Sequence, residues 1–213
     1  MKYISKDPSR EPESVKQWKQ LAANDPNYGY EYLRSKERKE LLQTLIEEQG
    51  YICCYCGMEI SDRTSHIEHV APQSTHPELS LEYTNLLASC GISDHIIAKN
   101  LAITHCEEHC GRKRGNKYLS VEPTNPDCET KFSYSAEGEI LPNNDSTVKT
   151  LNLNYTELKK LRKAAIEGLI SLFEDGFSNE EIDLFVKSFG KRDRDGKFQP
   201  FCFAITYFLK SYI

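Results

Sequence analysis

Two cysteines, Cys53 and Cys56, are separated by two residues in a short turn that Gly57 closes. This spacing lets two thiolates face one ion, and it is the usual half-site of a structural zinc. Zinc in such sites is tetrahedral and takes four protein ligands. The sequence therefore predicts a zinc-binding turn here, completed by two ligands from other parts of the chain.

Cys90 and Cys110 are the predicted third and fourth ligands. Cys90 ends an apolar run expected to be a strand, and Cys110 opens a short basic segment expected to be a helix. Cys106 is the alternative for the fourth place, because it would lie one helical turn from Cys110. Without a metal these cysteines would be small buried apolar side chains, but two clusters around a histidine-rich strand favour zinc. The other cysteines assessed, which lack such partners, are expected to be ordinary buried thiols: Cys54, Cys128 and Cys202.

A second group of chemically able residues, His66, Glu68 and His69, falls within four positions. On a strand, His66 and Glu68 share one face and His69 takes the other. A carboxylate suits a hard ion such as magnesium or manganese, and a neutral imidazole suits a general base near pH 7. Hydrolysis of a phosphodiester needs both, a base for water and a divalent ion for the phosphate. The alternative is a half-buried strand whose histidines are only hydrogen-bonded. For His66, the sequence supports this structural role and a functional role equally.

The combined pattern resembles the HNH (ββα-metal) nucleases. It has the Cys-x-x-Cys turn, acid-His-x-x-Pro-x-Ser at 68–74, Asn-Leu-x-x-x-Cys at 85–90 and Cys-x-x-x-Arg-Gly at 110–115. It is most similar to the HNH proteins of Septu-type and retron-associated phage defence, the PtuB-like proteins. The resemblance covers roughly residues 40–165.

The resemblance implies an HNH endonuclease that hydrolyses phosphodiester bonds in nucleic acid, DNA first and RNA or tRNA second. It implies His69 as the general base, Glu68 as a ligand of a catalytic Mg²⁺ or Mn²⁺, and Asn85 as the residue that fixes the loop between two strands. It also implies a partner ATPase of the ABC/SMC-like (PtuA-like) type and, in retron systems, a reverse transcriptase with its msDNA.

Two positions depart from the family pattern. Many HNH proteins carry Asp where this chain has Glu68, and the residue after the last cysteine, usually Asn, His or Asp, is Gly111. Glycine has no side chain that could bind the catalytic ion. The candidates for the missing ligand are His66, His109 and Asn116, with water as the other possibility.

The densest basic cluster lies directly after Cys110 and comprises Arg112, Lys113, Arg114 and Lys117. It is predicted to contact phosphates of the substrate, and the alternative is a solvated helix face. The whole chain carries a net charge of −5, whereas a free-standing nucleic-acid binder is usually basic. This balance favours delivery to the substrate by a partner.

The elements that must hold these residues are read from periodicity and caps. A helix is expected at 35–49, where four apolar residues form one stripe before Gly50. A shorter helix is expected near 14–22, a hairpin at 131–140, and helices at 154–173, 178–189 and 201–213, the first two opened by capping boxes at Asn154 and Ser178. An apolar element is expected at 95–103.

These elements give an α+β, mainly helical fold with a zinc-stabilised ββα-metal core and helical extensions at both ends. The predicted segments are 1–49 (arm and helix), 50–120 (nuclease core), 121–150 (hairpin segment) and 151–213 (helical region). No run approaches the length of a membrane span and no apolar leader opens the chain. Together with cysteines suited to metal binding, this predicts a cytoplasmic protein. The alternative function is a zinc-stabilised, catalytically weak module that binds nucleic acid or a partner.

Overall fold

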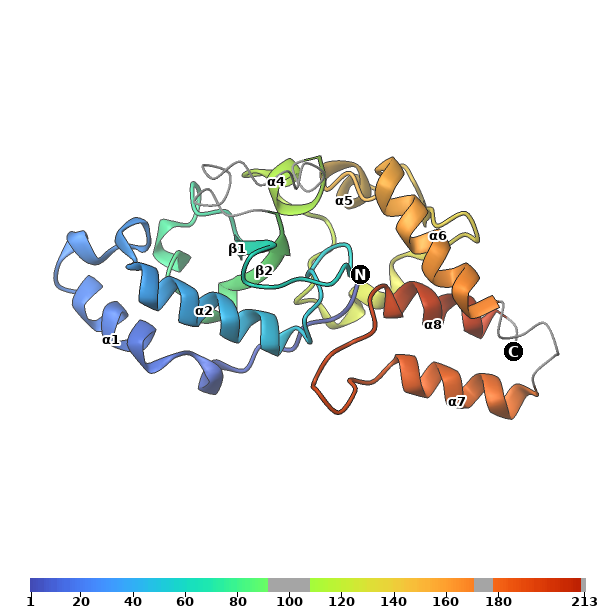
Figure 1. Ribbon diagram of the computed structural model, residues 1–213. Coiled ribbons are helices and arrows are strands. Elements are labelled where there is room, and N and C mark those ends of the chain that lie inside the picture. The colour runs from blue at the N-terminus through green and yellow to red at the C-terminus, as the bar shows by residue number, and fades with distance from the viewer. Residues whose placement is uncertain (92–107, 171–177, 212–213) are drawn as a thin grey trace.

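The structure is a computed structural model that describes residues 1–91, 108–170 and 178–211. Helices and two small antiparallel sheets are combined in an elongated molecule, with the N-terminal helices at one end and the C-terminal helices at the other (Figure 1). The predicted combination of helices with small sheets is therefore confirmed. The described helices and strands are α1 (Glu13–Ala22), α2 (Ser35–Glu48), β1 (Ser65–His69), β2 (Leu86–Cys90), α4 (Cys110–Arg114), β3 (Ser133–Tyr134), β4 (Ile140–Leu141), α5 (Ser146–Thr150), α6 (Thr156–Ile170), α7 (Asn179–Phe189) and α8 (Cys202–Lys210).

Helix α2 supports the central hairpin of β1 and β2. Its buried stripe, Leu41, Leu42, Leu45 and Ile46, is the one that the periodicity predicted. The helix ends where predicted. Gly50 follows it with a φ of 67°, a left-handed conformation that glycine adopts more easily than other residues. In Figure 1, α2 runs along one side of the β1–β2 pair and α4 lies on the other side.

Strands β1 and β2 pair antiparallel, with Ser65 opposite Cys90 and His69 opposite Leu86. The buried side chain of Gln49, at the end of α2, holds this hairpin from the side. Its amide donates to the carbonyls of Ile52 (3.0 Å) and Ala88 (2.8 Å) and accepts from the Ala88 N–H (2.6 Å). Gln49 thus binds β2 as a short extra strand would.

Replacing Gln49 with methionine is expected to lower the free energy of unfolding by about 2–6 kcal/mol. The methionine keeps the volume but leaves the Ala88 N–H and the Ile52 carbonyl buried without partners, at about 1–3 kcal/mol each. Chemical denaturation monitored by circular dichroism measures the change. Gln43→Met, on the same helix but half-buried and bonded to Glu47, is the control and should change stability by less than about 0.5 kcal/mol. Equal effects of the two substitutions would mean that the hydrogen bonds of Gln49 to Ile52 and Ala88 do not stabilise the hairpin.

In its described residues, the C-terminal half contains the predicted hairpin and helices, with the unpredicted short helix α5 in addition. The β3–β4 pair and helices α6, α7 and α8 are present, and Ser178 with Glu181 forms a full capping box on α7. The capping role predicted for Asn154 is wrong. Its amide instead binds both backbone groups of Ile140, accepting from the N–H (2.8 Å) and donating to the carbonyl (2.9 Å). Tertiary pairing with β4 takes the place of the local cap.

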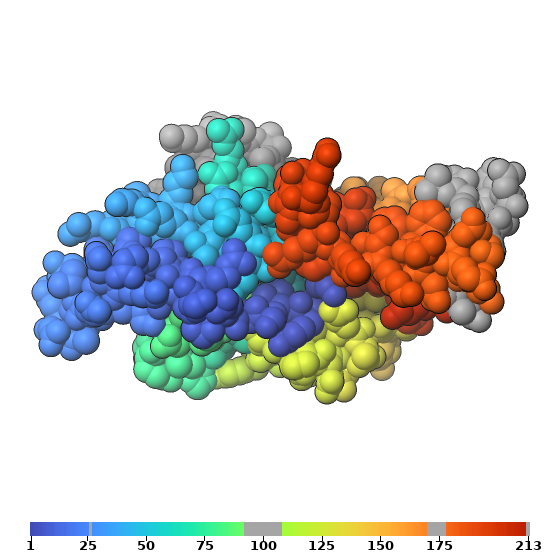
Figure 2. All heavy atoms as spheres, turned by 90° about the horizontal axis from the view of Figure 1, so that it is seen from below, coloured from blue at the N-terminus to red at the C-terminus, as the bar shows by residue number. Residues whose placement is uncertain are grey.

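One main core joins residues from all four predicted segments, from Met1 to Ala204. A smaller cluster of Leu169, Ile182, Ile205 and Leu209 holds α6, α7 and α8 together. The first residues of the chain lie against residues 120–135, as Figure 2 shows, and Ile4 N donates to Pro123 O (2.9 Å). Among the described helices, none has the length and apolar character needed to cross a membrane. The apolar element predicted at 95–103 lies outside the described residues.

Candidate metal and catalytic site

Four cysteine sulfur atoms gather in the middle of the molecule. The Sγ atoms of Cys53, Cys56, Cys90 and Cys110 all lie within 4.8 Å of one another, and all four residues are buried. Three separate parts of the chain supply them: the turn after α2, the last residue of β2 and the first residue of α4. These are the four positions that the spacing singled out.

The sulfur cluster fits a tetrahedral zinc ion. Sulfur atoms 2.3 Å from such an ion are about 3.8 Å apart, and the Sγ atoms of Cys56 and Cys90 are 3.7 Å apart. Backbone N–H groups of Tyr55 (3.5 Å) and Cys90 (3.3 Å) point at the Sγ of Cys53. Burial raises the pKa of the Cys53 thiol, but hydrogen bonds from neighbouring thiols, Cys110 first, outweigh burial and lower it well below its usual range. The thiolate that a metal needs is thus favoured at Cys53, whereas burial and then the neighbouring Cys53 and Cys56 raise the pKa of the Cys110 thiol well above its usual range.

Buried Arg162 lies in the electrostatic field of the sulfur cluster. Burial lowers the pKa of its guanidinium, while Cys56, Tyr134 and Cys110 raise it. Carbonyl oxygens of Gly138 (2.7 Å) and Leu153 (2.6 Å) hold the guanidinium. A divalent ion bound by four thiolates carries two net negative charges, so this cation offsets part of a buried charge.

The other predicted candidates around the cluster are placed differently. Nδ1 of His109 lies 3.2 Å from the Sγ of Cys110 and 3.7 Å from that of Cys90. His109 therefore belongs to the surroundings of the sulfur cluster and not to the Glu68 site for which it was a candidate. Asn116 is exposed. Cys106, the alternative to Cys110, lies outside the described residues. The thiols predicted to be ordinary are buried: Cys54, Cys128 and Cys202.

Glu68, on β1, is a buried carboxylate with two differently used oxygens. Oε1 accepts hydrogen bonds from Tyr55 Oη (2.9 Å) and Arg114 Nη1 (2.8 Å). Oε2 faces Nε2 of His66 at 3.4 Å. Burial alone raises the pKa of Glu68, but His66 and Arg114 outweigh burial, so the pKa lies below its usual range. The group is a fixed carboxylate with one oxygen left for a ligand.

The prediction that Arg114 contacts substrate phosphates is wrong. Its side chain is buried, with 2% of the residue exposed. Besides Glu68 and Tyr55, its guanidinium donates to the carbonyl oxygens of His69 (2.6 Å), Val70 and Lys117 (2.8 Å). Arg114 faces inward because helix α4 turns this side to β1, so its charge positions the end of that strand.

His69, the last residue of β1, has a defined ring orientation. Nε2 lies 3.0 Å from the carbonyl oxygen of Ser80. Because a carbonyl only accepts, Nε2 carries the proton, and the neutral ring keeps its lone pair on Nδ1. Burial lowers the pKa of His69 below its usual range. The ring of Tyr30 packs edge-on against it, with the centroids 4.6 Å apart. The residue is therefore a neutral, oriented imidazole.

Asn85 fixes the loop that connects the two strands. Its Oδ1 accepts from the Ala71 N–H (2.8 Å), and its Nδ2 donates to the carbonyls of Ala71 and Leu79, both at 3.2 Å. The Asn85 carbonyl also accepts from the Val70 N–H (2.9 Å). These bonds hold the chain directly after His69, which is the geometry that the predicted loop-positioning role requires.

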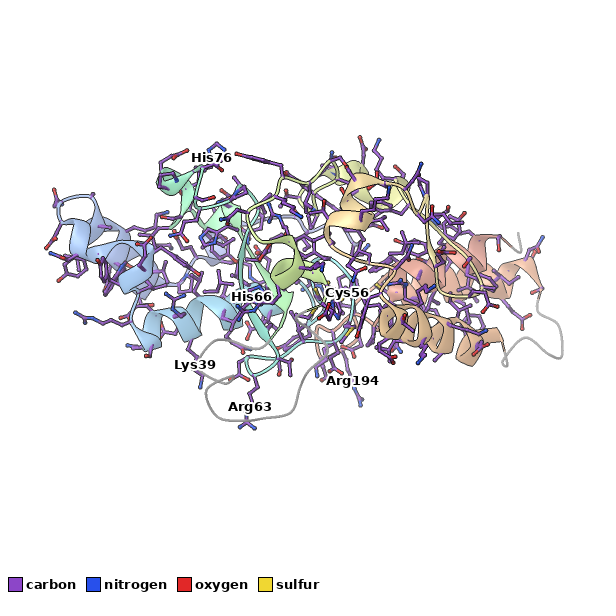
Figure 3. The ribbon with its side chains drawn as sticks, turned by 90° about the horizontal axis from the view of Figure 1, so that it is seen from above. Lys39, Cys56, Arg63, His66, His76 and Arg194 are labelled. Carbon is purple, nitrogen blue, oxygen red and sulfur yellow. The ribbon has the colours of Figure 1, made fainter. Side chains whose placement is uncertain are left out.

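An open cavity of about 510 Å³ lies beside His69. Its wall combines side chains of the β1–α4 region with side chains of the N-terminal segment, among them Tyr30, Arg38, Leu42, His66, His69 and Arg112. Figure 3 shows His66 near the middle of the long axis, between the N-terminal and C-terminal helices. Lys113 and Lys117 of the basic cluster are exposed. The cavity thus brings the imidazoles of His66 and His69 and the cations of Arg38 and Arg112 to one place.

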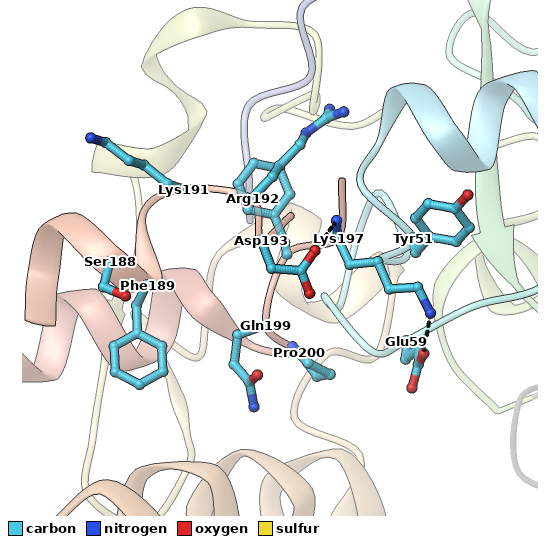
Figure 4. A pocket seen from close by; sticks show the side chains of 11 residues that line it. Tyr51, Glu59, Ser188, Phe189, Lys191, Arg192, Asp193, Lys197, Gln199 and Pro200 are labelled. Carbon is cyan, nitrogen blue, oxygen red and sulfur yellow. Dashed lines mark hydrogen bonds and ion pairs between the residues drawn. The ribbon is translucent and has the colours of Figure 1, made fainter. Parts of the chain in front are cut away.

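A second cavity of about 520 Å³ lies at the C-terminal loop (Figure 4). It carries charges of both signs, and Lys197 pairs with Glu59 at 3.8 Å. Arg192 is occupied by the backbone carbonyls of Glu47 and Glu48. None of the described residues that line this cavity carries an imidazole. Within the described ranges, the four cysteines are the one group of three or more potential metal ligands.

Tyr30 and Gln49 are residues whose roles the sequence did not indicate. Tyr30 lies far along the chain from His69, in an N-terminal 3-10 turn (Tyr30–Tyr32), and Arg38 braces it through its hydroxyl (3.2 Å) and carbonyl (3.1 Å). No local pattern marks such a contact. For Gln49, a polar residue directly after an apolar helix stripe was the available signal.

The chain is similar to proteins of two phage-defence systems, whereas no family model matches it. A protein named as an HNH endonuclease of retron Vc95, from Vibrio cholerae serotype O1 biovar El Tor, is 31% identical over 165 residues, covering 70% of this chain and 74% of that protein. A protein named as an HNH endonuclease of retron Ec83, from Escherichia coli, is 25% identical over 186 residues, covering 66% and 71%. The Septu protein PtuB of Bacillus thuringiensis is 28% identical over 122 residues, covering 53% of this chain and 40% of its own length.

Proposed function

This chain belongs to the HNH endonucleases of retron and Septu type, and from that premise we propose how its residues cut nucleic acid. The chain is a nuclease of anti-phage defence. In the proposal, residues 50–120 form a ββα-metal core made of β1, β2 and α4, with the sulfur cluster as a structural zinc site. The neighbouring segments 1–49, 121–150 and 151–213 support this core and contact partners.

The observation that carries the proposal is the orientation of His69. With Nε2 donating to Ser80 O at 3.0 Å, Nδ1 is the atom that can take a proton from water. The lowered pKa of His69 keeps the ring neutral, and hence able to accept a proton, near pH 7. The cavity beside the ring is wide enough for a phosphate group and a water molecule. His69 is the proposed general base.

Glu68 is the proposed protein ligand of the catalytic ion, through Oε2. Its other oxygen is occupied by Arg114 and Tyr55, which hold the carboxylate still. A divalent Mg²⁺ or Mn²⁺ bound there supplies electrostatic stabilisation of the charge that develops on the phosphate and the leaving oxygen. Arg114 also holds the His69 carbonyl at 2.6 Å, so one buried guanidinium fixes both catalytic positions relative to each other.

The substrate is proposed to be DNA, with RNA or tRNA as the second choice. The partners proposed from the family are an ABC/SMC-like ATPase (PtuA-like) and, in a retron context, a reverse transcriptase and its msDNA, acting in the cytoplasm. The test is cleavage of plasmid DNA, total tRNA and matched 2′-deoxy oligonucleotides with manganese, with and without the co-encoded ATPase. Cleavage of tRNA alone would mean that the substrate is RNA and not DNA. If neither substrate were cleaved in any arm, the nuclease proposal would be contradicted.

The second candidate function is a zinc-stabilised binding module with weak or no catalysis, and the glycine at position 111 favours it. Other HNH proteins have a metal-binding side chain at this position, and this chain has none. If the protein is such a binding module, it should bind nucleic acid but not cleave it when Mg²⁺ or Mn²⁺ is added. The cleavage assay above separates the two candidates.

The exposed lysines of the basic cluster are expected to bind phosphates next to the cavity. The double substitution Lys113→Ala with Lys117→Ala should weaken binding of any DNA sequence. It should also reduce the slope of log Kobs against log[salt] by about 2, because each phosphate contact contributes about 0.9. Fluorescence anisotropy over a salt series measures this. The matched control is Lys160→Ala with Lys187→Ala, two exposed lysines of α6 and α7. The same loss of slope in the control would mean that the cluster is not the binding surface.

A further inference from the structure

The imidazole of His66 occupies a slot between two glycines. A Cβ atom added at Gly91 would lie 2.9 Å from its Nδ1, and one added at Gly111 would lie 2.7 Å from its Nε2. Both separations are shorter than non-bonded atoms tolerate. The ring can therefore stand in this position only because residues 91 and 111 carry no side chain.

Position 111 faces the same point as the functional atoms of Glu68 and His66. A Cβ at Gly111 would lie 2.5 Å from Oε2 of Glu68 as well as 2.7 Å from Nε2 of His66. A longer side chain at this position would enter the space where these two atoms meet. In HNH proteins that carry Asn, His or Asp here, that residue would approach the same carboxylate. In this chain the imidazole of His66 fills the space instead.

We propose that Nε2 of His66 is the second protein ligand of the catalytic ion, together with Oε2 of Glu68. The inference rests on the proposed function, because it takes Glu68 as the first ligand. His66, on β1, then supplies the second ligand that Gly111, on α4, cannot provide. Both ligands lie on the same face of one strand.

The separation of the two atoms fits a shared ion better than a direct ion pair. Nε2 and Oε2 are 3.4 Å apart, whereas a charge-assisted N–H···O bond is about 2.7–2.9 Å long. Two ligands about 2.1 Å from one octahedral ion are about 3.0 Å apart at a right angle, so a small approach of the two side chains would let them share an ion. The other oxygen of the same carboxylate shows the contrast, since Arg114 reaches it at 2.8 Å.

The donor set also sets the preference among ions. An imidazole with a carboxylate favours first-row transition ions, whereas Mg²⁺ prefers oxygen ligands alone. The structure thus points to Mn²⁺ or a similar ion binding more tightly than Mg²⁺. A carboxylate with an Asn carbonyl at position 111 would offer an all-oxygen set and a weaker bias.

Isothermal titration of zinc-loaded protein with Mn²⁺ tests the inference without any substrate. His66→Ala and Glu68→Gln should each weaken Mn²⁺ binding by at least about tenfold, since even outer-shell partners of a metal contribute 10–100-fold. Zinc content and thermal unfolding report that the variants are folded. His76→Ala is the matched control, because His76 and Glu78 form a second His-x-Glu pair, at 3.1 Å, on an exposed turn. It should leave the affinity for Mn²⁺ unchanged.

A ligand swap provides the second arm. In the variant His66→Gly with Glu68→Asp and Gly111→Asn, the slot is emptied and the shorter carboxylate makes room for a Cβ at 111, which would otherwise lie 2.5 Å from Oε2 of Glu68. Mn²⁺ affinity should recover relative to His66→Gly with Glu68→Asp, and the ratio of Mn²⁺ to Mg²⁺ affinity should fall.

Wild-type Mn²⁺ affinity in His66→Ala, with Glu68→Gln impaired, would overturn the inference and leave the nuclease function standing. Absence of any Mn²⁺ site besides the zinc in the wild type would overturn it too. The cleavage assay then decides the proposed function separately, because cleavage lost only in His69→Ala would still identify an HNH nuclease.

Discussion

Replacing His69 with alanine is expected to slow phosphodiester cleavage by about 100- to 10,000-fold, the usual contribution of a general base. In the wild type, Nε2 of His69 donates to the Ser80 carbonyl, which leaves the lone pair of Nδ1 as the proton acceptor. The variant removes this lone pair. It keeps Glu68, Arg114 and the sulfur cluster. Zinc content should therefore stay at one ion per chain, and the loss of stability should not exceed about 1 kcal/mol. Initial rates on plasmid DNA and tRNA with manganese, with and without the proposed partner ATPase, measure the effect.

Two further measurements separate catalysis from structure. His76→Ala removes a half-buried imidazole that bonds to Glu78 and Tyr118, away from the cavity beside His69, and this variant should cut at the wild-type rate. Imidazole added to the His69→Ala protein should restore part of the lost rate, because the open cavity admits a small base from solution. A purely structural role for His69 predicts no such rescue. Cleavage at the wild-type rate by folded His69→Ala would remove His69 from the mechanism.

The cavity beside His69 is built by parts of the chain far apart in sequence. The N-terminal segment supplies Tyr30 and Arg38, and α2 supplies Leu42, opposite the strand that carries the base. Tyr30 packs against the side of the His69 ring and limits its rotation, in addition to the Ser80 bond. The N-terminal segment is therefore part of the wall of the proposed active site and not only a support for the core.

Local signals predicted most of the elements and the cysteine set. The stripe of α2 and the stop at Gly50 are properties of neighbouring residues, so periodicity and a glycine suffice to find them. The positions of Cys90 and Cys110 followed from the expected ends of a strand and a helix, and their sulfur atoms do meet those of Cys53 and Cys56.

The errors arose where tertiary contacts decide. Helix α4 has only five residues, too few for a periodicity that would tell which of its basic residues turn inward, so buried Arg114 looked like its exposed neighbour Lys113. Asn154 carries a cap signal, but β4 binds its amide instead. The contact of Tyr30 with His69 joins segments that no sequence pattern relates. Such features depend on how elements pack, which spacing along the chain does not encode.

Removing the metal from the sulfur cluster is expected to unfold the nuclease core. The four sulfur atoms tie together the turn after α2, the end of β2 and the start of α4. Structural zinc contributes about 10–16 kcal/mol of binding free energy in small zinc domains, while whole domains are stable by only about 5–15 kcal/mol. Cys90→Ser should therefore lose zinc and lack a cooperative thermal transition for the core. Metal analysis by mass spectrometry and circular dichroism on heating test both.

Cys54 provides the matched control for this experiment. It lies in the same turn as Cys53 and Cys56 and is equally buried, but its sulfur is not one of the four that cluster. Cys54→Ala should keep one zinc per chain and unfold cooperatively, with a loss of about 1–2 kcal/mol for the small cavity. If Cys90→Ser retained zinc and its unfolding transition, the cluster would be only a packed group of thiols. If both variants unfolded alike, packing of the turn rather than metal binding would hold the core. Loss of zinc and cooperativity in Cys90→Ser alone would mean that the position of the catalytic strand depends on the metal, because β1 is held through β2, whose last residue is a ligand.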